Sequence, residues 1–349
     1  MREPFIWDKY SDQPYPLKDK IYKKKMRKKH MWAYIPLLIT NIFLFPLTVL
    51  IMKIFKGQTI DKKFFYGMGV DVDKGDVQKE LIEELGVKYL LIRMPLWEMH
   101  RVEEYVIFAK SFGEDKQILL NILQDREHIE DRELLKKDIE IIFDRFGTFV
   151  KEYQVGNAIN RTKWGFFSMD EYLGWYEVIQ NIRDEKYPKL KLIGSSVIDF
   201  EYHYTIRTLF NFFNIKYDAF SSLLYVDRRG APQNVQMGIF DTKNKINMLY
   251  ALTKLSSKTS SEIYITEVNW PLSNTAPYAP TSEVECVSEE AYEKFMLSYH
   301  AVSLESAKIQ RVYWHQLVAA GYGLVDDRGE VVRKTKAFES YKKMIKASN

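Results

Sequence analysis

Polar and aromatic side chains follow directly after a series of short apolar segments in this chain of 349 residues. The clearest example is residues 263–270, IYITEVNW, where Glu267 and Trp270 follow a run of strand-forming residues. Comparable segments run into acids, amides, aromatic residues or an arginine: Asp71, Asp73, Arg93, Asp125, Asn157, Asn160, Asp199, Glu201, Tyr225 and Trp314. Amides and acids bond sugar hydroxyls, aromatic rings stack on sugar faces, and paired carboxyl groups cleave glycosidic bonds. These residue types predict a carbohydrate site if the fold brings them together.

Eight apolar segments alternate with eight amphipathic ones from residue 64 onward. The apolar segments predict strands at 64–72, 89–96, 117–123, 152–157, 191–198, 219–226, 263–270 and 311–318. The segments with helical spacing are 77–85, 102–112, 130–146, 170–184, 202–213, 240–255, 289–306 and 335–346. Near-continuous apolar strands that alternate with helices are typical of a parallel sheet covered by helices, and eight units favour an α/β fold of the (β/α)8 or TIM barrel type. A doubly wound open sheet is the alternative, although it usually carries a glycine-rich phosphate turn after its first strand.

A (β/α)8 barrel places its active site at the carboxyl ends of the strands, so the polar groups named above are expected at one rim. Arg93 is informative, because a guanidinium inside an apolar strand requires an anionic partner. Ordinary structural roles compete with the functional ones. Glu267 would also be typical of a surface acid at a strand end, the two asparagines of the fourth segment of a helix cap, and the tryptophans of the barrel core.

Three segments together resemble a known family. ITEVNW at 265–270 resembles the nucleophile strand of clan-A retaining glycoside hydrolases, and YQVGNAIN at 153–160 resembles their strand-four segment. VYWHQL at 312–317 and the tail that follows resemble the closing unit of the xylosidase- and iduronidase-like members. The resemblance covers about residues 64–345 and implies a barrel that acts on carbohydrate without a cofactor.

The resemblance implies a role for individual residues. Glu267 matches the nucleophile, and Asn157 matches the asparagine that bonds the sugar hydroxyl beside the reacting carbon. Arg93 and Tyr225 fall where the family holds the nucleophile ionised and oriented, and Trp314 matches the aromatic floor of the sugar subsite. Asn160 and Trp270, in the same motifs, are further candidate sugar contacts.

The sequence departs from the family at Ala158, where the acid/base glutamate is expected. Retaining cleavage uses two carboxyl groups about 5–5.5 Å apart, one that attacks and one that protonates the leaving oxygen. A positioned general acid typically supplies about 10²–10⁴-fold in rate, and alanine has no proton to give. The candidate replacement acids are Asp71, Asp73, Asp125, Asp199 and Glu201.

The N-terminal region has a different composition. Residues 18–29, KDKIYKKKMRKK, are strongly basic, and residues 32–51 contain no charged residue. An uncharged stretch of about 20 apolar residues is long enough to cross a bilayer. A signal peptide and a buried core helix are the alternatives. The excess of Lys and Arg before this stretch predicts a cytoplasmic tail at 1–31, a transmembrane helix at 32–54 and a barrel at 57–349 outside the cytoplasmic membrane. The barrel core should then fold without residues 1–56.

Composition excludes several function classes. The net charge of +4 is modest and local, so it does not indicate a nucleic-acid partner. The single cysteine, Cys286, cannot form an internal disulfide. The sequence contains no metal-ligand spacing, serine-nucleophile elbow or phosphate loop, so it predicts neither a metal nor another cofactor.

Three functions fit these patterns. The first is a membrane-anchored glycoside hydrolase that acts on a cell-envelope glycan. The second is an inactive sugar-binding barrel that serves as the partner subunit of an envelope enzyme, and the third is a scaffold that only kept the barrel. The anchored layout also resembles two-component membrane hydrolases that remove Kdo from lipopolysaccharide cores, although no motif carries that resemblance.

Overall fold

The computed structural model describes residues 1–348, and its centre is a closed parallel barrel of eight strands in the order β10-β3-β4-β5-β6-β7-β8-β9. These strands are β3 (Tyr66–Val70), β4 (Tyr89–Pro95), β5 (Gln117–Leu123), β6 (Glu152–Val155), β7 (Lys191–Ile198), β8 (Ala219–Leu223), β9 (Ile263–Ile265) and β10 (Arg311–Trp314). All eight lie within the predicted segments. The prediction of a TIM barrel is confirmed, and the open-sheet alternative is excluded because β10 pairs with β3 and closes the sheet.

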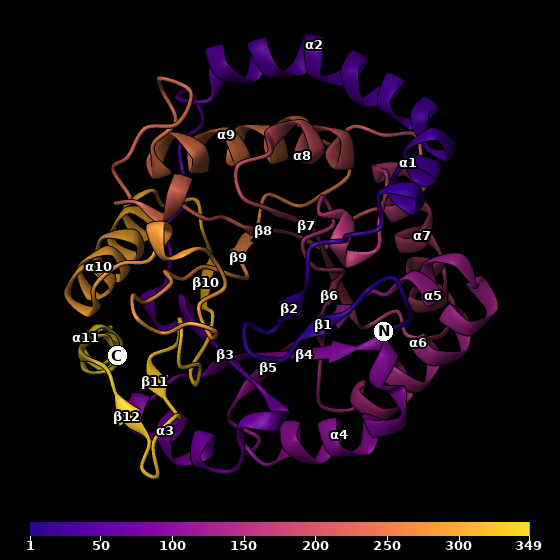
Figure 1. Cartoon of the computed structure of the whole chain (residues 1–349). Helices are drawn as coiled ribbons and strands as arrows, with labels where there is room; N and C mark the ends of the chain where they lie inside the picture. The colour runs from indigo at the N-terminus through magenta and orange to yellow at the C-terminus, as the bar shows by residue number, and fades with distance from the viewer. Residues whose placement is uncertain (349) are drawn as a thin grey trace.

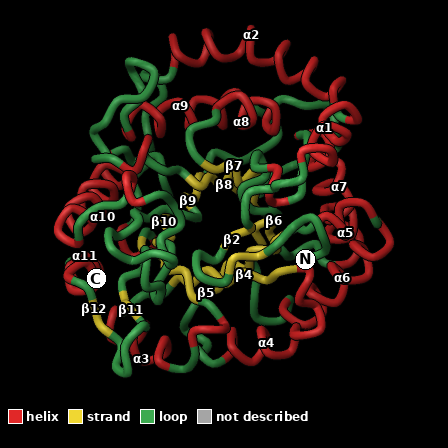
Figure 2. Tube along the Cα trace, in the orientation of Figure 1, coloured by secondary structure: helices red, strands yellow, loops and turns green. Residues whose placement is uncertain are grey.

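Helices surround the strands in a ring, which Figure 2 shows in red around the yellow strands. The ring consists of α3 (Val77–Leu85), α4 (Val102–Lys110), α5 (Arg126–Glu130), α6 (Arg132–Phe146), α7 (Met169–Lys186), α8 (Tyr202–Leu209), α9 (Thr242–Leu255), α10 (Glu289–Glu305) and α11 (Lys336–Lys346). Polar residues begin several of them: the side chains of Asp131, Ser168, Asp241 and Ser288 accept hydrogen bonds from the first turns of α6, α7, α9 and α10.

Side chains fill the end of the barrel that lies away from the active-site rim. Tyr89, Leu91, Leu119, Ile193, Ala219, Tyr264 and Tyr313 form a buried cluster inside it. The guanidinium of Arg311 lies 3.7 Å from the ring centre of Tyr89 and 3.0 Å from Glu152. The barrel is therefore closed below, and a ligand can enter only from the carboxyl ends of the strands.

The predicted apolar helix is present as α2 (Tyr34–Ile51). It forms most of the helical run at 31–51, which is long and apolar enough to cross a membrane. It lies along the outside of α8 and α9 (Figure 1). Phe45 stacks on Tyr202 at 4.2 Å, and Asn41 donates to the backbone oxygen of His203. Leu37 and Met52 are buried in the same hydrophobic core as the barrel, so that core is not independent of residues 1–56 as the sequence had suggested.

The N-terminal tail does not stand apart from the barrel. Its elements are β1 (Trp7–Asp8), β2 (Gln13–Pro14) and the basic helix α1 (Lys20–Lys29). Figure 1 shows the indigo tail crossing the middle of the ring of strands. The side chain of Gln13 donates to the backbone oxygen of Pro280 at 2.9 Å. This arrangement differs from the predicted one, in which a bilayer separates residues 1–31 from residues 57–349, because such contacts cannot form across a membrane.

Candidate active site

Glu267 follows β9 at the carboxyl rim of the barrel, and two side chains from other strands hold its carboxylate. Arg93, on β4, donates from Nη2 to Oε2 at 2.5 Å, and the hydroxyl of Tyr225, just after β8, donates to Oε1 at 2.7 Å. The side chains of Arg93 and Glu267 are only 11% and 10% exposed. The predicted pairing of Arg93 with Glu267 is confirmed, and the buried guanidinium has the anionic partner that its place in an apolar strand required.

This surrounding keeps Glu267 ionised. Burial by itself raises the pKa of Glu267, but the positive charge of Arg93 and the hydrogen bonds from Arg93 and Tyr225 lower it to about 2. Burial and the nearby Arg93 also lower the pKa of His315, beside the carboxylate, to about 3, so that the imidazole is neutral at pH 7. A buried carboxylate that carries its charge at neutral pH is prepared to attack an electrophilic carbon.

Arg93 has a second carboxylate partner that comes from the tail. Its Nη1 donates to Oδ2 of Asp12 at 2.9 Å and to the backbone oxygen of the same residue at 3.0 Å. Lys163 donates to the side-chain oxygen of Gln13 at 2.6 Å, which ties the next tail residue to the loop after β6. The sequence does not indicate a role for Asp12, because no local pattern shows that a residue more than fifty positions before the barrel lies at its rim.

Two adjoining cavities open at this rim. One, of about 180 Å³, is lined by Asp12, Arg93, Lys163, Glu267, His315 and Tyr322 among others. The other, of about 290 Å³, is lined by Glu201, Asp227, Arg228 and Gln236 among others. Both share Arg161, Asp199, Tyr225 and Arg229. Ligand pockets typically enclose about 300–1,000 Å³, so the two together have the size of a small-ligand cleft.

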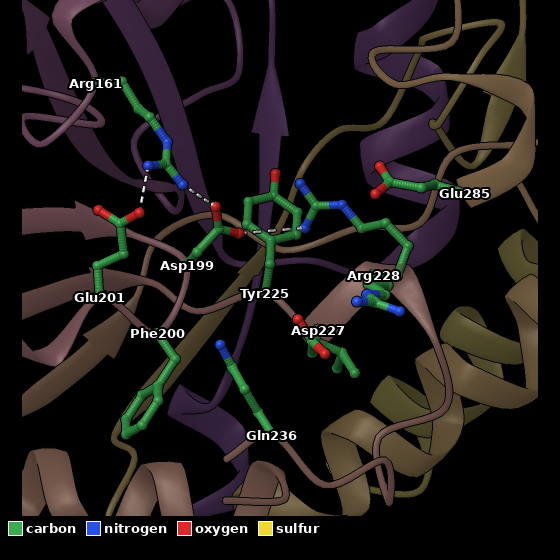
Figure 3. Close-up of a pocket in the computed structure, with 11 residues that line it drawn as sticks. Arg161, Asp199, Phe200, Glu201, Tyr225, Asp227, Arg228, Gln236 and Glu285 are labelled. Atoms are coloured by element: carbon green, nitrogen blue, oxygen red, sulfur yellow. Dashed lines mark hydrogen bonds and ion pairs between the residues drawn. The ribbon is translucent and has the colours of Figure 1, made fainter.

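Basic side chains dominate the boundary between the two cavities. Arg161 forms ion pairs of 2.5 Å with both Asp199 and Glu201, as Figure 3 shows for these three side chains. The guanidinium of Arg229 lies 3.5 Å from the ring centre of Tyr225. Its Nη1 is buried without a hydrogen-bond partner among residues 1–348. The sequence did not lead us to predict Arg161 or Arg229 as site residues. The two consecutive arginines after the sixth strand, Arg228 and Arg229, were the one local sign of a basic site.

The rim after β6 holds alanine at the position where the resemblance led us to expect a glutamate. Ala158 is fully buried in the hydrophobic core and has a backbone φ of 45°. Its neighbours at the cleft are cationic: Arg161 and Lys163 line it, and burial lowers the pKa of Lys163 to about 8. The loop after β6 therefore places Lys163, and Arg161 in its ion pairs with Asp199 and Glu201, where a carboxylic acid was expected.

The side chains of the two predicted asparagines both have partners inside the protein. Asn157 is 1% exposed, and its side-chain oxygen accepts from Asn121 at 3.0 Å. Asn160 accepts from the backbone nitrogen of Ile198 at 2.9 Å and donates to Glu201 at 2.6 Å. Neither lines the cleft. The Nδ2 group of Asn157 is buried without a partner among residues 1–348, which leaves one donor free.

The two predicted aromatic contacts also lie beneath the surface. Trp270 and Trp314 are fully buried and stack on each other at 5.9 Å. Trp270 donates from Nε1 to the backbone oxygen of Gly230, and Trp314 donates to the hydroxyl of Tyr292. Both indole N–H groups are satisfied inside the protein, so the structure differs from the expectation that these rings form the floor of a sugar subsite.

The five candidate replacement acids already have partners. Asp71 accepts from the backbone nitrogen of Asp73, and Asp73 pairs with Arg101 at 2.6 Å. Asp125 caps α5 and contacts His128 at 3.0 Å, and it lines neither of the two cavities. Asp199 and Glu201 share Arg161, as described above. Of the five, only Asp199 lines the cavity that contains Glu267.

No group of three His, Cys, Asp or Glu residues in the described part of the chain is arranged to hold a metal ion. The chemistry available at the rim is therefore that of an ionised carboxylate, a phenol, a neutral imidazole and several cations.

Comparisons with known proteins place this fold among glycosidases. The structure is similar to a family 1 β-glucosidase from Thermotoga maritima, with a TM-score of 0.57 and 11% identity over 84% of this chain and 99% of that one. It is also similar to a rice β-glucosidase, with a TM-score of 0.59 and 10% identity over 82% and 98%. A GH39 β-xylosidase from Caulobacter crescentus gives a TM-score of 0.56 and 12% identity over 82% and 72%.

No family model and no curated protein matches the sequence. At these identities the likeness shows the fold alone: a TIM barrel of the type found in glycoside hydrolases of families 1, 39 and 2.

Proposed function

We propose that this protein is a membrane-attached retaining glycoside hydrolase that acts on a cell-envelope glycan, with Glu267 as the nucleophile. The observation that carries the proposal is the buried carboxylate held by Arg93 and Tyr225 at the barrel rim, with its pKa lowered to about 2. A carboxylate in this state attacks the anomeric carbon and forms a glycosyl-enzyme intermediate, which water then hydrolyses.

The charge of the cleft supports an acidic glycan as the substrate. Arg161, Lys163 and Arg229 line the cavities beside Glu267. Nη1 of Arg229 lies 3.9 Å from Asp199 and donates no hydrogen bond among the described residues. A guanidinium recognises a carboxylate or phosphate by paired hydrogen bonds. An acidic sugar of a lipopolysaccharide core is one glycan of this kind, and it is the substrate class we favour.

Two features of the same rim also support a second function, that of an inactive sugar-binding barrel. Ala158 supplies no proton, and the tail residue Asp12 occupies space beside Glu267. An inactive sugar-binding barrel that serves as a partner subunit would have these two features. The two functions differ in whether Glu267 can react.

Trapping with activated donors tests the two functions. Dinitrophenyl glycosides need no protonation of the leaving group, so a working Glu267 should form a covalent adduct even though residue 158 is alanine. We would incubate the protein with the 2,4-dinitrophenyl 2-fluoro glycosides of glucose, xylose and galacturonic acid and analyse its peptides by mass spectrometry. An adduct on the peptide that contains Glu267 supports the hydrolase. Sugar binding by calorimetry without any adduct supports the binding subunit.

We also propose that α2 attaches the protein to the outer face of the cytoplasmic membrane by lying along the bilayer. The segments before and after α2 both pack on the barrel. The N-terminal tail and the barrel should therefore lie on the same side of the membrane. Large apolar side chains point outward along it: Trp32, Ile35, Leu38, Ile42, Phe43 and Leu50 are 45–80% exposed. The adjacent α1 carries the lysines that attract anionic headgroups.

Vesicle sedimentation tests this attachment. The protein should bind vesicles that contain phosphatidylglycerol more strongly than pure phosphatidylcholine vesicles, and salt should weaken the binding. Phe43→Asp should reduce it at least tenfold. Ile107→Asp, which changes an equally apolar side chain that is 68% exposed on α4, is the matched control and should bind as wild type does. Equal binding by both variants would contradict the proposal.

A further inference from the structure

The tail is docked on the active-site rim by several independent contacts. The ring of Trp7 packs against Trp97 at 5.2 Å and against Trp164 at 5.8 Å. Phe5 and Leu17 are buried in a cluster with Phe167 that lies outside the main core. These anchors lie on both sides of the turn between β1 and β2. They fix that turn, and with it Asp12, over the mouth of the barrel.

Asp12 and Glu267 flank one guanidinium. The carboxylate of Asp12 contacts Nη1 of Arg93 at 2.9 Å, and the carboxylate of Glu267 contacts Nη2 at 2.5 Å. Both side chains line the same cavity of about 180 Å³. Retaining glycosidases place two carboxyl groups in one cleft about 5–5.5 Å apart. Here two carboxyl groups contact the two terminal nitrogens of one guanidinium.

We propose that Asp12 is the general acid and base of the site and supplies, from the N-terminal tail, the proton that Ala158 cannot give. The inference rests on the proposed hydrolase function and extends it. The acid has moved from the fourth strand to a segment outside the barrel, and the catalytic pair is complete only when the tail is docked.

The surroundings of Asp12 suit a group that gives and takes a proton near neutral pH. Burial raises the pKa of Asp12 to about 7, and the charges that face it act in both directions. Arg93 on β4 and Lys74 after β3 lower the pKa, whereas Asp71 and Glu267 raise it. The phenol of Tyr322, after β10, also faces this carboxyl group. An acid whose pKa lies near the operating pH is the most effective proton donor.

Cleavage takes two steps, with Glu267 as the nucleophile and Asp12 as the proton donor and acceptor. The carboxylate of Glu267 forms a bond to the anomeric carbon while the bond from that carbon to the leaving oxygen breaks, and the proton of Asp12 passes to that oxygen. The carboxylate of Asp12 then takes a proton from water, whose oxygen bonds to the anomeric carbon and releases Glu267. Asp12 ends protonated and Glu267 ends ionised, as both began.

Asp12→Asn, which keeps the shape of the side chain, tests the assignment in the full-length protein. Glycosylation by phenyl glycosides of the sugar that traps Glu267 should fall about 10²–10⁴-fold, because phenol needs protonation on leaving. Glycosylation by the dinitrophenyl glycoside should change by less than about threefold. Azide, which attacks without a general base, should restore turnover of the dinitrophenyl substrate in Asp12→Asn and yield the glycosyl azide.

The matched control is Asp8→Asn in the same tail, because Asp8 accepts hydrogen bonds from the backbone of Tyr10 and from Ser11 but does not contact Arg93. It should leave the ratio of phenyl to dinitrophenyl rates unchanged. Equal loss on both substrates without azide rescue would mean that Asp12 only positions the tail, and higher activity of Asp12→Asn would mean that the tail blocks the site; either result overturns the inference. Failure of wild type to form the Glu267 adduct would overturn the proposed function itself, whereas adduct formation with a phenyl rate that Asp12→Asn does not alter would overturn only the assignment of the acid.

Discussion

The rims after β9 and after β6 lie in one cleft but have changed to different extents relative to the glycosidase pattern. After β9, Glu267 keeps a guanidinium and a phenol as hydrogen-bond donors, and its pKa is lowered to about 2. After β6, Ala158 is buried, and Arg161 and Lys163 face the cleft in its place. The surroundings of Glu267 therefore match those expected for the proposed nucleophile, whereas the loop expected to hold the acid carries Arg161 and Lys163.

The difference between the two rims shows how far the position of Glu267 depends on residues of other strands. Glu267 is held by residues of two other strands, so its geometry is fixed by the closure of the barrel. A carboxyl group delivered from another segment can replace the acid expected after β6, provided that this segment is anchored at the rim.

The largest effect is expected at Glu267. Glu267→Gln keeps the shape of the side chain but removes the attacking charge, so hydrolysis of the dinitrophenyl glycoside should fall by at least about 10³-fold, and the covalent adduct should disappear. Stopped-flow release of dinitrophenol and mass spectrometry measure the two effects. Circular dichroism should confirm an unchanged fold. Activity that survives in Glu267→Gln would show that the carboxylate after β9 is not the nucleophile.

Arg93→Met should have the next largest effect, because it removes the partner that keeps Glu267 charged. The pKa of Glu267 should rise, since the effect of burial is then opposed by His315 and Tyr225 without the charge of Arg93. Truncating one partner of a buried ion pair typically costs about 3–5 kcal/mol in the free energy of unfolding. In wild type, the stabilisation from Glu267 is present above its unfolded pKa and is lost as pH falls toward about 2. In Arg93→Met the pKa of Glu267 is raised, so protonation of this group favours the folded state as pH falls. The difference in the free energy of unfolding between wild type and Arg93→Met should therefore become smaller at lower pH.

Urea unfolding between pH 4 and pH 8 measures this change. Arg328→Met is the control, because it breaks an Arg–Asp pair of 2.7 Å whose arginine is 37% exposed. It should cost no more than about 1 kcal/mol, with little dependence on pH. Equal losses in the two variants would contradict a special electrostatic role for Arg93.

The substitution Ala158→Glu tests whether the loop after β6 can hold a carboxylic acid. From the sequence, restoring the glutamate is expected to raise cleavage about 10²–10⁴-fold if the site is otherwise intact. The structure predicts a different outcome: residue 158 is fully buried at a φ of 45°, so the new carboxyl group should destabilise the fold by several kcal/mol and leave cleavage without gain. Thermal unfolding and phenyl glycoside hydrolysis measure both effects.

Ala158→Gly is its control, because glycine tolerates a positive φ and should leave stability within about 1 kcal/mol of wild type. A stable Ala158→Glu variant with faster cleavage would show that the acid position after β6 is merely vacant.

The smallest effect is expected for Asn160→Ala. It removes the part-buried hydrogen bonds to both backbone groups of Ile198, and a hydrogen bond typically contributes about 0.5–1.5 kcal/mol to stability. KM and kcat should change less than threefold, because the side chain joins β6 to β7 and does not line the cleft. A large rise in KM at unchanged stability would instead identify Asn160 as a sugar contact.

Local pattern was enough to predict the barrel and part of the site. Each strand segment is apolar along its length, and a parallel strand that is buried on both faces requires this wherever it lies in the barrel. The partnership of Arg93 with Glu267 was also predictable, since a charge in an apolar strand demands a counter-charge at the same rim. The strands and the Arg93–Glu267 pair follow from burial and charge, and both can be read from the residue types within each strand.

The tertiary structure alone decided which side chains face the cleft. Trp270 and Trp314 follow strands just as Glu267 does, yet they turn into the packing between strands and helices, because their rings find partners there. Asp12 belongs to a tail whose composition predicted the opposite side of a membrane, and it reaches Arg93 only because the aromatic contacts of the tail dock it on the rim. A contact between residues so distant in the chain is set by the fit of whole surfaces, which no local pattern records.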